Sequence, residues 1–239
     1  MVMRRFILAA LAAVLAAWAS AGVAENAPAF ATPDAAIAAY VEGVARRDFV
    51  EILAATATDR MYAHFDFAAY VDSLGLLTPT MAAPAGDPLL SDIDRAEFTA
   101  GIAHQVKMLT YALLGRWDLA GDKPVAMKPG DAAALLSALD LGRLGGLELV
   151  RVGTPKPALI GSEGYRKNAA RRAGIYGADE MSERAALLRL EGQTYLLGFT
   201  LLRFGASWAV TAQWSPVAGT NALGAPWPMT PQQFEDLLK

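Results

Sequence analysis

Apolar residues recur at intervals of three and four along the segment that follows Thr32. This spacing predicts an amphipathic helix, because side chains three and four positions apart share one helical face. Threonine is a favoured N-cap residue and proline suits the first helical position, so the helix is expected to begin at Pro33. Its buried stripe would consist of Ile37, Tyr40, Val41 and Val44.

The same kind of pattern predicts four more helices before residue 146. They would cover residues 49–55, 59–74, 92–114 and 131–140. Asp48 with Glu51, and Ser91 with Asp94, have the spacing of caps for the first and third of these. The seam of the longest helix would consist of Phe98, Ile102, Val106, Leu109 and Leu113. Prolines and glycines indicate loops over residues 75–90 and 115–130.

Strand patterns dominate after residue 146. They cover residues 147–152, 184–190, 194–204 and 207–215, and glycine-containing turns separate the last three. In the last run, Trp208, Val210, Ala212 and Trp214 alternate with smaller or polar residues, which is typical of a strand with one buried face. Residues 153–182 fit neither pattern, and a final helix is expected after Thr230.

Helices followed by strands are the order of an α+β fold. Two stretches resemble the nuclear transport factor 2-like (SnoaL-like) superfamily. Residues 32–40 with Arg47-Asp48-Phe49 look like its first helix and the following turn, and residues 201–210 are similar to its late hairpin, which ends in a Trp-x-Val strand. The resemblance implies a cone in which N-terminal helices pack on a curved C-terminal antiparallel sheet around an apolar cavity. It implies no particular activity, because the superfamily includes isomerases, dehydratases, hydrolases and non-catalytic binding modules.

The middle of the chain is longer and more helical than the core of that superfamily. We interpret residues 25–239 as a single domain in which residues 56–146 form a helical insertion. Such an insertion would either leave the cavity open or fill it.

The N-terminus is interpreted as a cleavable secretory signal peptide over residues 1–24. It contains a basic region, an apolar run and a stretch of small residues, namely Arg4 and Arg5, residues 6–18, and residues 19–24. Cleavage is expected after Ala24. An uncleaved membrane anchor is the alternative, since residues 6–24 approach the length of about 20 that spans a bilayer.

Composition limits the cellular compartments and the kinds of chemistry that are compatible with the chain. The chain has no cysteine, which in an exported protein favours a soluble periplasmic protein of a Gram-negative bacterium and excludes disulfides and thiolate chemistry. Removal of Arg4 and Arg5 from the 21 basic residues leaves 19 of them against 24 acidic residues, a net charge of −5. This charge argues against nucleic-acid binding and against binding to anionic membranes after cleavage.

Candidate residues for chemistry are few. Standard nucleophile, nucleotide and metal motifs are absent and there are two histidines, so we expect no cofactor and no metal. Asp66 and Tyr70 are four residues apart and could form an acid–base pair on one helical face. His64 and His104 are further candidates for catalysis, although an ordinary helical position is the commoner role for each of the four.

Two further groups are candidates for binding. Tyr195, Trp208 and Trp214 could line a ligand pocket, although core packing is their commoner role. A basic cluster could bind an anion or an acidic partner, or could form a solvated helix face. It consists of Arg166, Lys167, Arg171 and Arg172.

Two functions are compatible with these observations. The favoured hypothesis is a non-catalytic periplasmic module that binds an apolar small molecule or a protein partner, and a homodimer is also compatible. The alternative is a cofactor-free acid–base enzyme, an isomerase, dehydratase or hydrolase, in which Asp66, Tyr70 and a histidine converge on one cavity.

Overall fold

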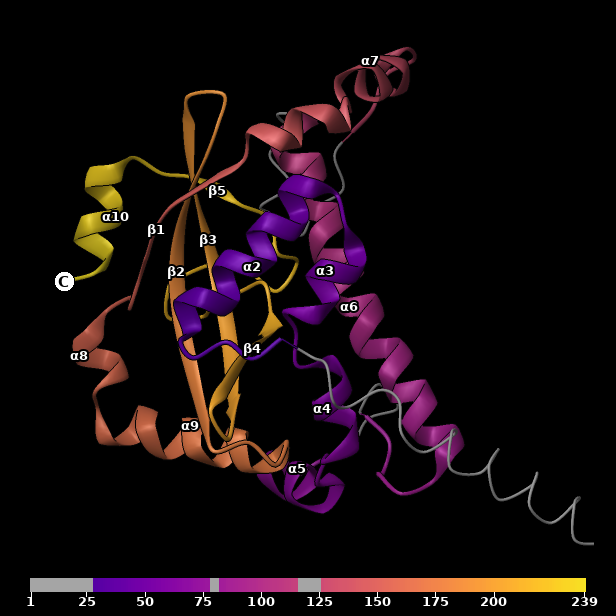
Figure 1. Cartoon of the computed structure of the whole chain (residues 1–239), viewed down its shortest axis with the longest axis vertical. Coiled ribbons are helices and arrows are strands. Elements are labelled where there is room, and N and C mark those ends of the chain that lie inside the picture. The colour runs from indigo at the N-terminus through magenta and orange to yellow at the C-terminus, as the bar shows by residue number, and fades with distance from the viewer. Residues whose placement is uncertain (1–27, 78–81, 116–125) are drawn as a thin grey trace, which may run out of the picture.

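Helices occupy the first half of the chain, and the five described strands all lie in the second half among shorter helices, as in an α+β fold (Figure 1). The computed structural model describes residues 28–77, 82–115 and 126–239. The predicted signal peptide, and parts of the two predicted loops, lie outside these residues. None of the helices within the described ranges is long and apolar enough to cross a membrane.

The element bounds follow the chain from helices to sheet. The helices are α2 (Pro33–Arg46), α3 (Phe49–Ala54), α4 (Thr58–Ala63), α5 (Phe67–Leu74), α6 (Pro88–Gly115), α7 (Asp131–Ala138), the 3₁₀ helix η1 (Leu141–Gly146), α8 (Pro157–Ile160), α9 (Glu163–Ile175) and α10 (Pro231–Leu237). The strands are β1 (Glu148–Gly153), β2 (Glu180–Leu190), β3 (Gln193–Phe204), β4 (Ser207–Ala212) and β5 (Trp227–Pro228).

Helix α2 confirms the first prediction. The Thr32 side chain accepts a hydrogen bond from the Ala35 backbone N–H at 3.1 Å, as an N-cap does. The predicted stripe is buried, and the Tyr40 ring packs edge-on against Phe199 with ring centroids 5.5 Å apart. Asp48 caps α3 by accepting hydrogen bonds from the backbone N–H groups of two residues in its first turn.

Two predicted helix boundaries are wrong. The helix expected over residues 59–74 is interrupted, because the Asp66 side chain accepts the Ala69 N–H and so begins a new helix, α5. The longest helix begins at Pro88 rather than after Ser91, because Asp87 already accepts two N–H groups of the first turn. Asp94 is buried and accepts the Ala83 N–H instead.

The strands form one antiparallel sheet in the order β1-β2-β3-β4, and β5 pairs with β3. The long β2–β3 hairpin turns at Glu191 and Gly192, which both have positive φ as a tight two-residue turn requires. The segment without a clear pattern, residues 153–182, contains α8 and α9.

A β-bulge interrupts the β3–β4 ladder. Thr200 pairs with Ala212 whereas the next residue, Leu201, pairs with Val210, so Thr211 is an extra residue on β4. An extra residue reverses which side of the strand later side chains occupy. Trp208 therefore belongs to the main core while Trp214 lies on the other side of the sheet, and the expectation that both share one face is wrong.

The two faces of the sheet are covered by different elements. One face packs against α2, α6 and η1, and this contact forms the largest core cluster. The other face is covered by α9 near the start of β2 and by α10 near the other end of the strands (Figure 1). The loop over residues 213–226 lies between them, since Ala218 packs with Ala185 and Phe234. This second face contains the site described next.

Candidate ligand pocket

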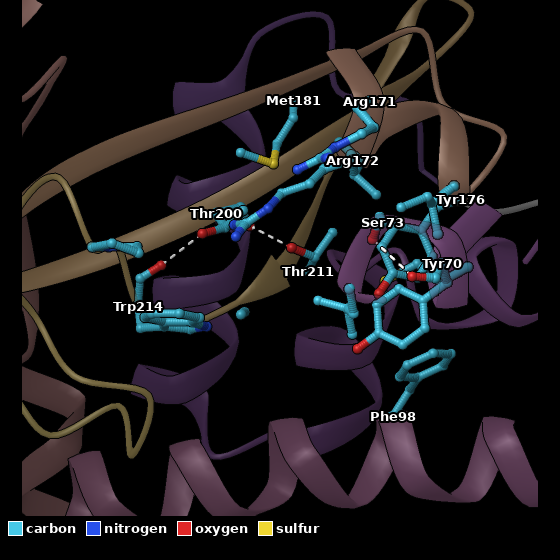
Figure 2. Close-up of a pocket in the computed structure, with 16 residues that line it drawn as sticks. Tyr70, Ser73, Phe98, Arg171, Arg172, Tyr176, Met181, Thr200, Thr211 and Trp214 are labelled. Atoms are coloured by element: carbon cyan, nitrogen blue, oxygen red, sulfur yellow. Dashed lines mark hydrogen bonds between the residues drawn. The ribbon is translucent and has the colours of Figure 1, made fainter. Parts of the chain in front are cut away.

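A cavity of about 430 Å³ lies between the second face of the sheet and helices α4, α5, α6 and α9 (Figure 2). It falls within the range of about 300–1,000 Å³ in which small-molecule pockets are found. Met61 of α4 and Leu202 of β3 are among the apolar residues that line it. The described helices between residues 56 and 146 leave this volume open.

Aromatic rings form the helical wall of the cavity. Phe65 lies 5.3 Å from Tyr70 and 5.6 Å from Tyr176, and Phe98 lies 6.4 Å from Tyr176, between ring centroids. Burial raises the pKa of Tyr176 to about 12, and the nearby Tyr70 contributes in the same direction. The Tyr176 hydroxyl is therefore neutral at pH 7 and can donate a hydrogen bond.

The bulge builds the sheet wall. The Thr200 hydroxyl donates to the backbone oxygen of Trp214 at 2.9 Å, and the Thr211 hydroxyl donates to the backbone oxygen of Thr200 at 3.1 Å (Figure 2). These bonds hold the chain after β4 against β3 and place the Trp214 side chain on the cavity. Because both hydroxyl protons are already donated to backbone oxygens, this wall offers a ligand mainly apolar contact.

Two arginines of α9 lie at the edge of the cavity. Arg171 and Arg172 are both exposed, and Figure 2 shows their side chains extending toward the side where Met181 and Thr200 lie. The Arg171 guanidinium donates to the Asn168 side-chain oxygen at 3.4 Å. Neither arginine forms an ion pair with a carboxylate in the part of the chain that the structure describes.

A buried carboxylate supports the wall from behind. Glu183 accepts hydrogen bonds from the Tyr165 hydroxyl at 3.0 Å, from the Ser215 hydroxyl, and from the Val217 N–H at 3.0 Å. Burial and the neighbouring Glu183 raise the pKa of Tyr165 above its usual value. Glu183 thereby ties β2 and α9 to the loop that carries Trp214. Sequence reasoning missed it, although an acidic residue just before an apolar strand run was a signal that could have been noticed.

The four candidate catalytic residues do not converge. Tyr70 lines the cavity, whereas the Asp66 carboxylate is exposed and caps α5. His64 is exposed and its Cβ lies against Gly177, and His104 is exposed on α6.

The candidate binding residues divide between two places. Trp214 lines the cavity, whereas Trp208 is buried in the main core and Tyr195 packs against that core. Within the basic cluster, Arg171 and Arg172 line the cavity, whereas Arg166 and Lys167 are exposed elsewhere on α9.

The lining is mainly apolar and aromatic. No carboxylate and no histidine occurs among the sixteen described residues that line the cavity. Within the same described ranges, no three His, Asp or Glu side chains are grouped as metal ligands would be. What the cavity offers is an apolar and aromatic interior, two phenol hydroxyls and a cationic edge.

Comparisons with known proteins support the fold. No family model matches the chain, and no curated protein sequence matches it. Among solved structures, the chain is similar to a cystatin-like protein from Ruminococcus gnavus ATCC 29149, with a TM-score of 0.53 and 16% sequence identity. The match covers 87% of this chain and 43% of the longer R. gnavus chain. At this identity the similarity shows an α+β fold with a curved antiparallel sheet of the cystatin-like type.

Proposed function

We propose that this protein is a non-catalytic binding module that holds a small, largely apolar molecule in the cavity between α9 and the sheet. The observation that carries the proposal is the cavity itself, which has about 430 Å³ of space and an aromatic wall. Few polar groups project into it. An apolar and aromatic lining with few polar groups is typical of small-molecule sites.

The alternative function, acid–base catalysis without a cofactor, has less support. It requires a proton acceptor within hydrogen-bond reach of the substrate. Of the candidates, Tyr70 alone reaches the cavity, and no carboxylate or histidine lies beside it among the described lining residues. Binding of a protein partner, in place of a small molecule, is the other version of the binding hypothesis.

Two broader assignments belong to the same proposal. We place the chain as a distant member of the nuclear transport factor 2-like superfamily, supported by the helix-then-meander order and by the packing of α2 on the sheet. We also propose that it acts in the periplasm, supported by the leader-like sequence over residues 1–24 and by the absence of cysteine.

Binding of a neutral fluorescent probe tests the proposed function. N-phenyl-1-naphthylamine is uncharged and apolar, and its fluorescence should rise when the wild-type protein is added. The variant Ser73→Trp should abolish this rise, because Ser73 lines the cavity and indole would occupy its volume. The matched control is Ala68→Trp, which adds the same side chain to an exposed position on the same helix.

The control should bind the probe as the wild type does, and both variants should unfold at nearly the wild-type temperature. Native mass spectrometry of the purified protein should also show any co-purified ligand and its stoichiometry. Equal probe binding by Ser73→Trp and the wild type would overturn the proposal.

A further inference from the structure

We infer that the ligand is a small organic anion with a flat apolar body, and that Arg171 and Arg172 bind its oxyanion at the edge of the cavity. This inference rests on the proposed function and adds the charge and shape of the ligand. It depends on three observations, namely the unpaired arginines, the engagement of the nearby acids with other residues, and the aromatic wall.

The two arginines differ from most others in this protein. Seven arginines of the described residues pair with carboxylates, namely Arg46, Arg95, Arg143, Arg151, Arg184, Arg189 and Arg203. Arg171 and Arg172 lack such a partner within those residues, although both line the cavity. An external carboxylate, sulfonate or phosphate would supply the missing partner in the bidentate geometry that guanidinium groups favour.

Acids close to α9 are engaged elsewhere. Asp179 and Glu180, which follow the helix, both pair with Arg203. The buried Glu183 accepts three hydrogen bonds from neutral donors. None of these three acids forms an ion pair with Arg171 or Arg172.

The shape of the ligand follows from the opposite wall. Phe98, Tyr70 and Tyr176 present aromatic rings, and Trp214 lies on the sheet side of the same cavity (Figure 2). Flat ring systems pack against such side chains in offset or edge-on arrangements. A fused-ring or phenyl-substituted acid would place its body there and its oxyanion at the arginines.

A matched pair of probes isolates the contribution of the charge. 1-Anilinonaphthalene-8-sulfonate has the same ring scaffold as N-phenyl-1-naphthylamine and differs by one sulfonate. The wild-type protein should bind the sulfonate at least tenfold more tightly than the neutral probe at low salt. This preference should shrink as the salt concentration rises, because exposed charges are screened.

Two double variants on the same helix test the assignment. Arg171→Ala/Arg172→Ala should weaken sulfonate binding about tenfold and leave neutral-probe binding within twofold. The control, Arg166→Ala/Lys167→Ala, removes the same charge from exposed positions that do not line the cavity and should leave both affinities unchanged. Displacement by 2-naphthoate and by 2-naphthyl phosphate then compares the two oxyanions, with 2-naphthol as the neutral reference.

The outcomes separate this inference from the proposed function. If the neutral probe binds as well as the sulfonate, and the arginine pair can be removed without effect, the anion inference fails while the pocket stands. If neither probe responds to Ser73→Trp, the pocket fails and the inference fails with it. Displacement by 2-naphthol as strong as by 2-naphthoate would also overturn the anion inference.

Discussion

The two faces of the sheet are built from the same strands but are covered in different ways. On the face that packs against α2, Phe199 and Leu197 are fully buried among apolar side chains, and Tyr40 makes an edge-on ring contact. On the opposite face, Thr200 and Leu202 border an open cavity. Adjacent residues of one strand therefore alternate between a filled core and an open cavity.

The two faces are held together by different kinds of interaction. The filled face depends on close apolar packing, which is strong and non-directional. The cavity face depends on directed hydrogen bonds, such as those that Glu183 accepts from three donors and those of Thr200 and Thr211. Directed bonds can keep a wall in place without filling the space in front of it.

A matched pair of leucine truncations should separate the two faces most strongly. Leu197→Ala should lower the free energy of unfolding by about 4 kcal/mol, because it opens a new cavity in the filled core. Leu202→Ala should cost about 2 kcal/mol, since it enlarges a space that already exists. Urea denaturation at pH 7 measures both, and equal losses would show that the two faces are packed alike.

Replacement of the buried acid should have the next largest effect. Glu183→Gln should lower the free energy of unfolding by about 2.5 kcal/mol. Both carboxylate oxygens now accept hydrogen bonds, and the substitution replaces one of them with an amide nitrogen, which cannot accept. The control, Glu180→Gln, lies on the same strand in an exposed ion pair with Arg203 and should cost less than about 1 kcal/mol. The difference in urea midpoint between the two variants measures this, and similar losses would contradict a supporting role for Glu183.

One polar contact within the filled face provides a smaller test. Tyr40→Phe should cost about 1.5 kcal/mol, because it leaves the Gln213 side-chain oxygen, now 3.0 Å from the Tyr40 hydroxyl, buried without a donor. Tyr111→Phe serves as the control at a partly exposed tyrosine. The unfolding temperature should fall for Tyr40→Phe and stay unchanged for Tyr111→Phe. An unchanged temperature for Tyr40→Phe would indicate that apolar packing accounts for the stability of this face entirely.

Alkaline pH should give the smallest of these effects. The pKa of Tyr176 is about 12 in the folded chain and about 10 in an unfolded one, so between these values the unfolded state loses the proton first. The stability that this group contributes is complete below pH 10 and is lost as the pH rises toward 12. Between pH 9 and pH 11 the free energy of unfolding of Tyr176→Phe should therefore fall by about 1 kcal/mol less than that of the wild type. Urea unfolding at both pH values checks this, and parallel losses would refute it.

The helical stripes and the strand meander could be predicted because local spacing determines them. The α2 stripe, the α6 seam and the β2–β3 turn all follow from residues close in sequence. Predictions were wrong where a polar side chain competed with a longer pattern. Asp66 and Asp87 each begin a helix at a position that apolar periodicity alone does not indicate. The role of residues 56–146 as an insertion stays a prediction.

The site could be predicted in its parts but not as a whole. Tyr70, Trp214, Arg171 and Arg172 were separate candidates, and no local pattern indicates that they line the same cavity. Their convergence depends on how α5, α9 and the end of β4 pack together, which involves residues far apart in the chain. The buried Glu183 was missed because its partners, Tyr165 and Ser215, are distant in sequence.

The extra residue at Thr211 has an evolutionary consequence. It divides one short stretch of chain into a part that belongs to the core, with Trp208 and Val210, and a part that belongs to the cavity, with Trp214. Substitutions before the bulge are constrained by packing, while substitutions after it alter the lining of the cavity. Selection can therefore reshape the cavity in descendants of this chain while the packing that folds them is conserved.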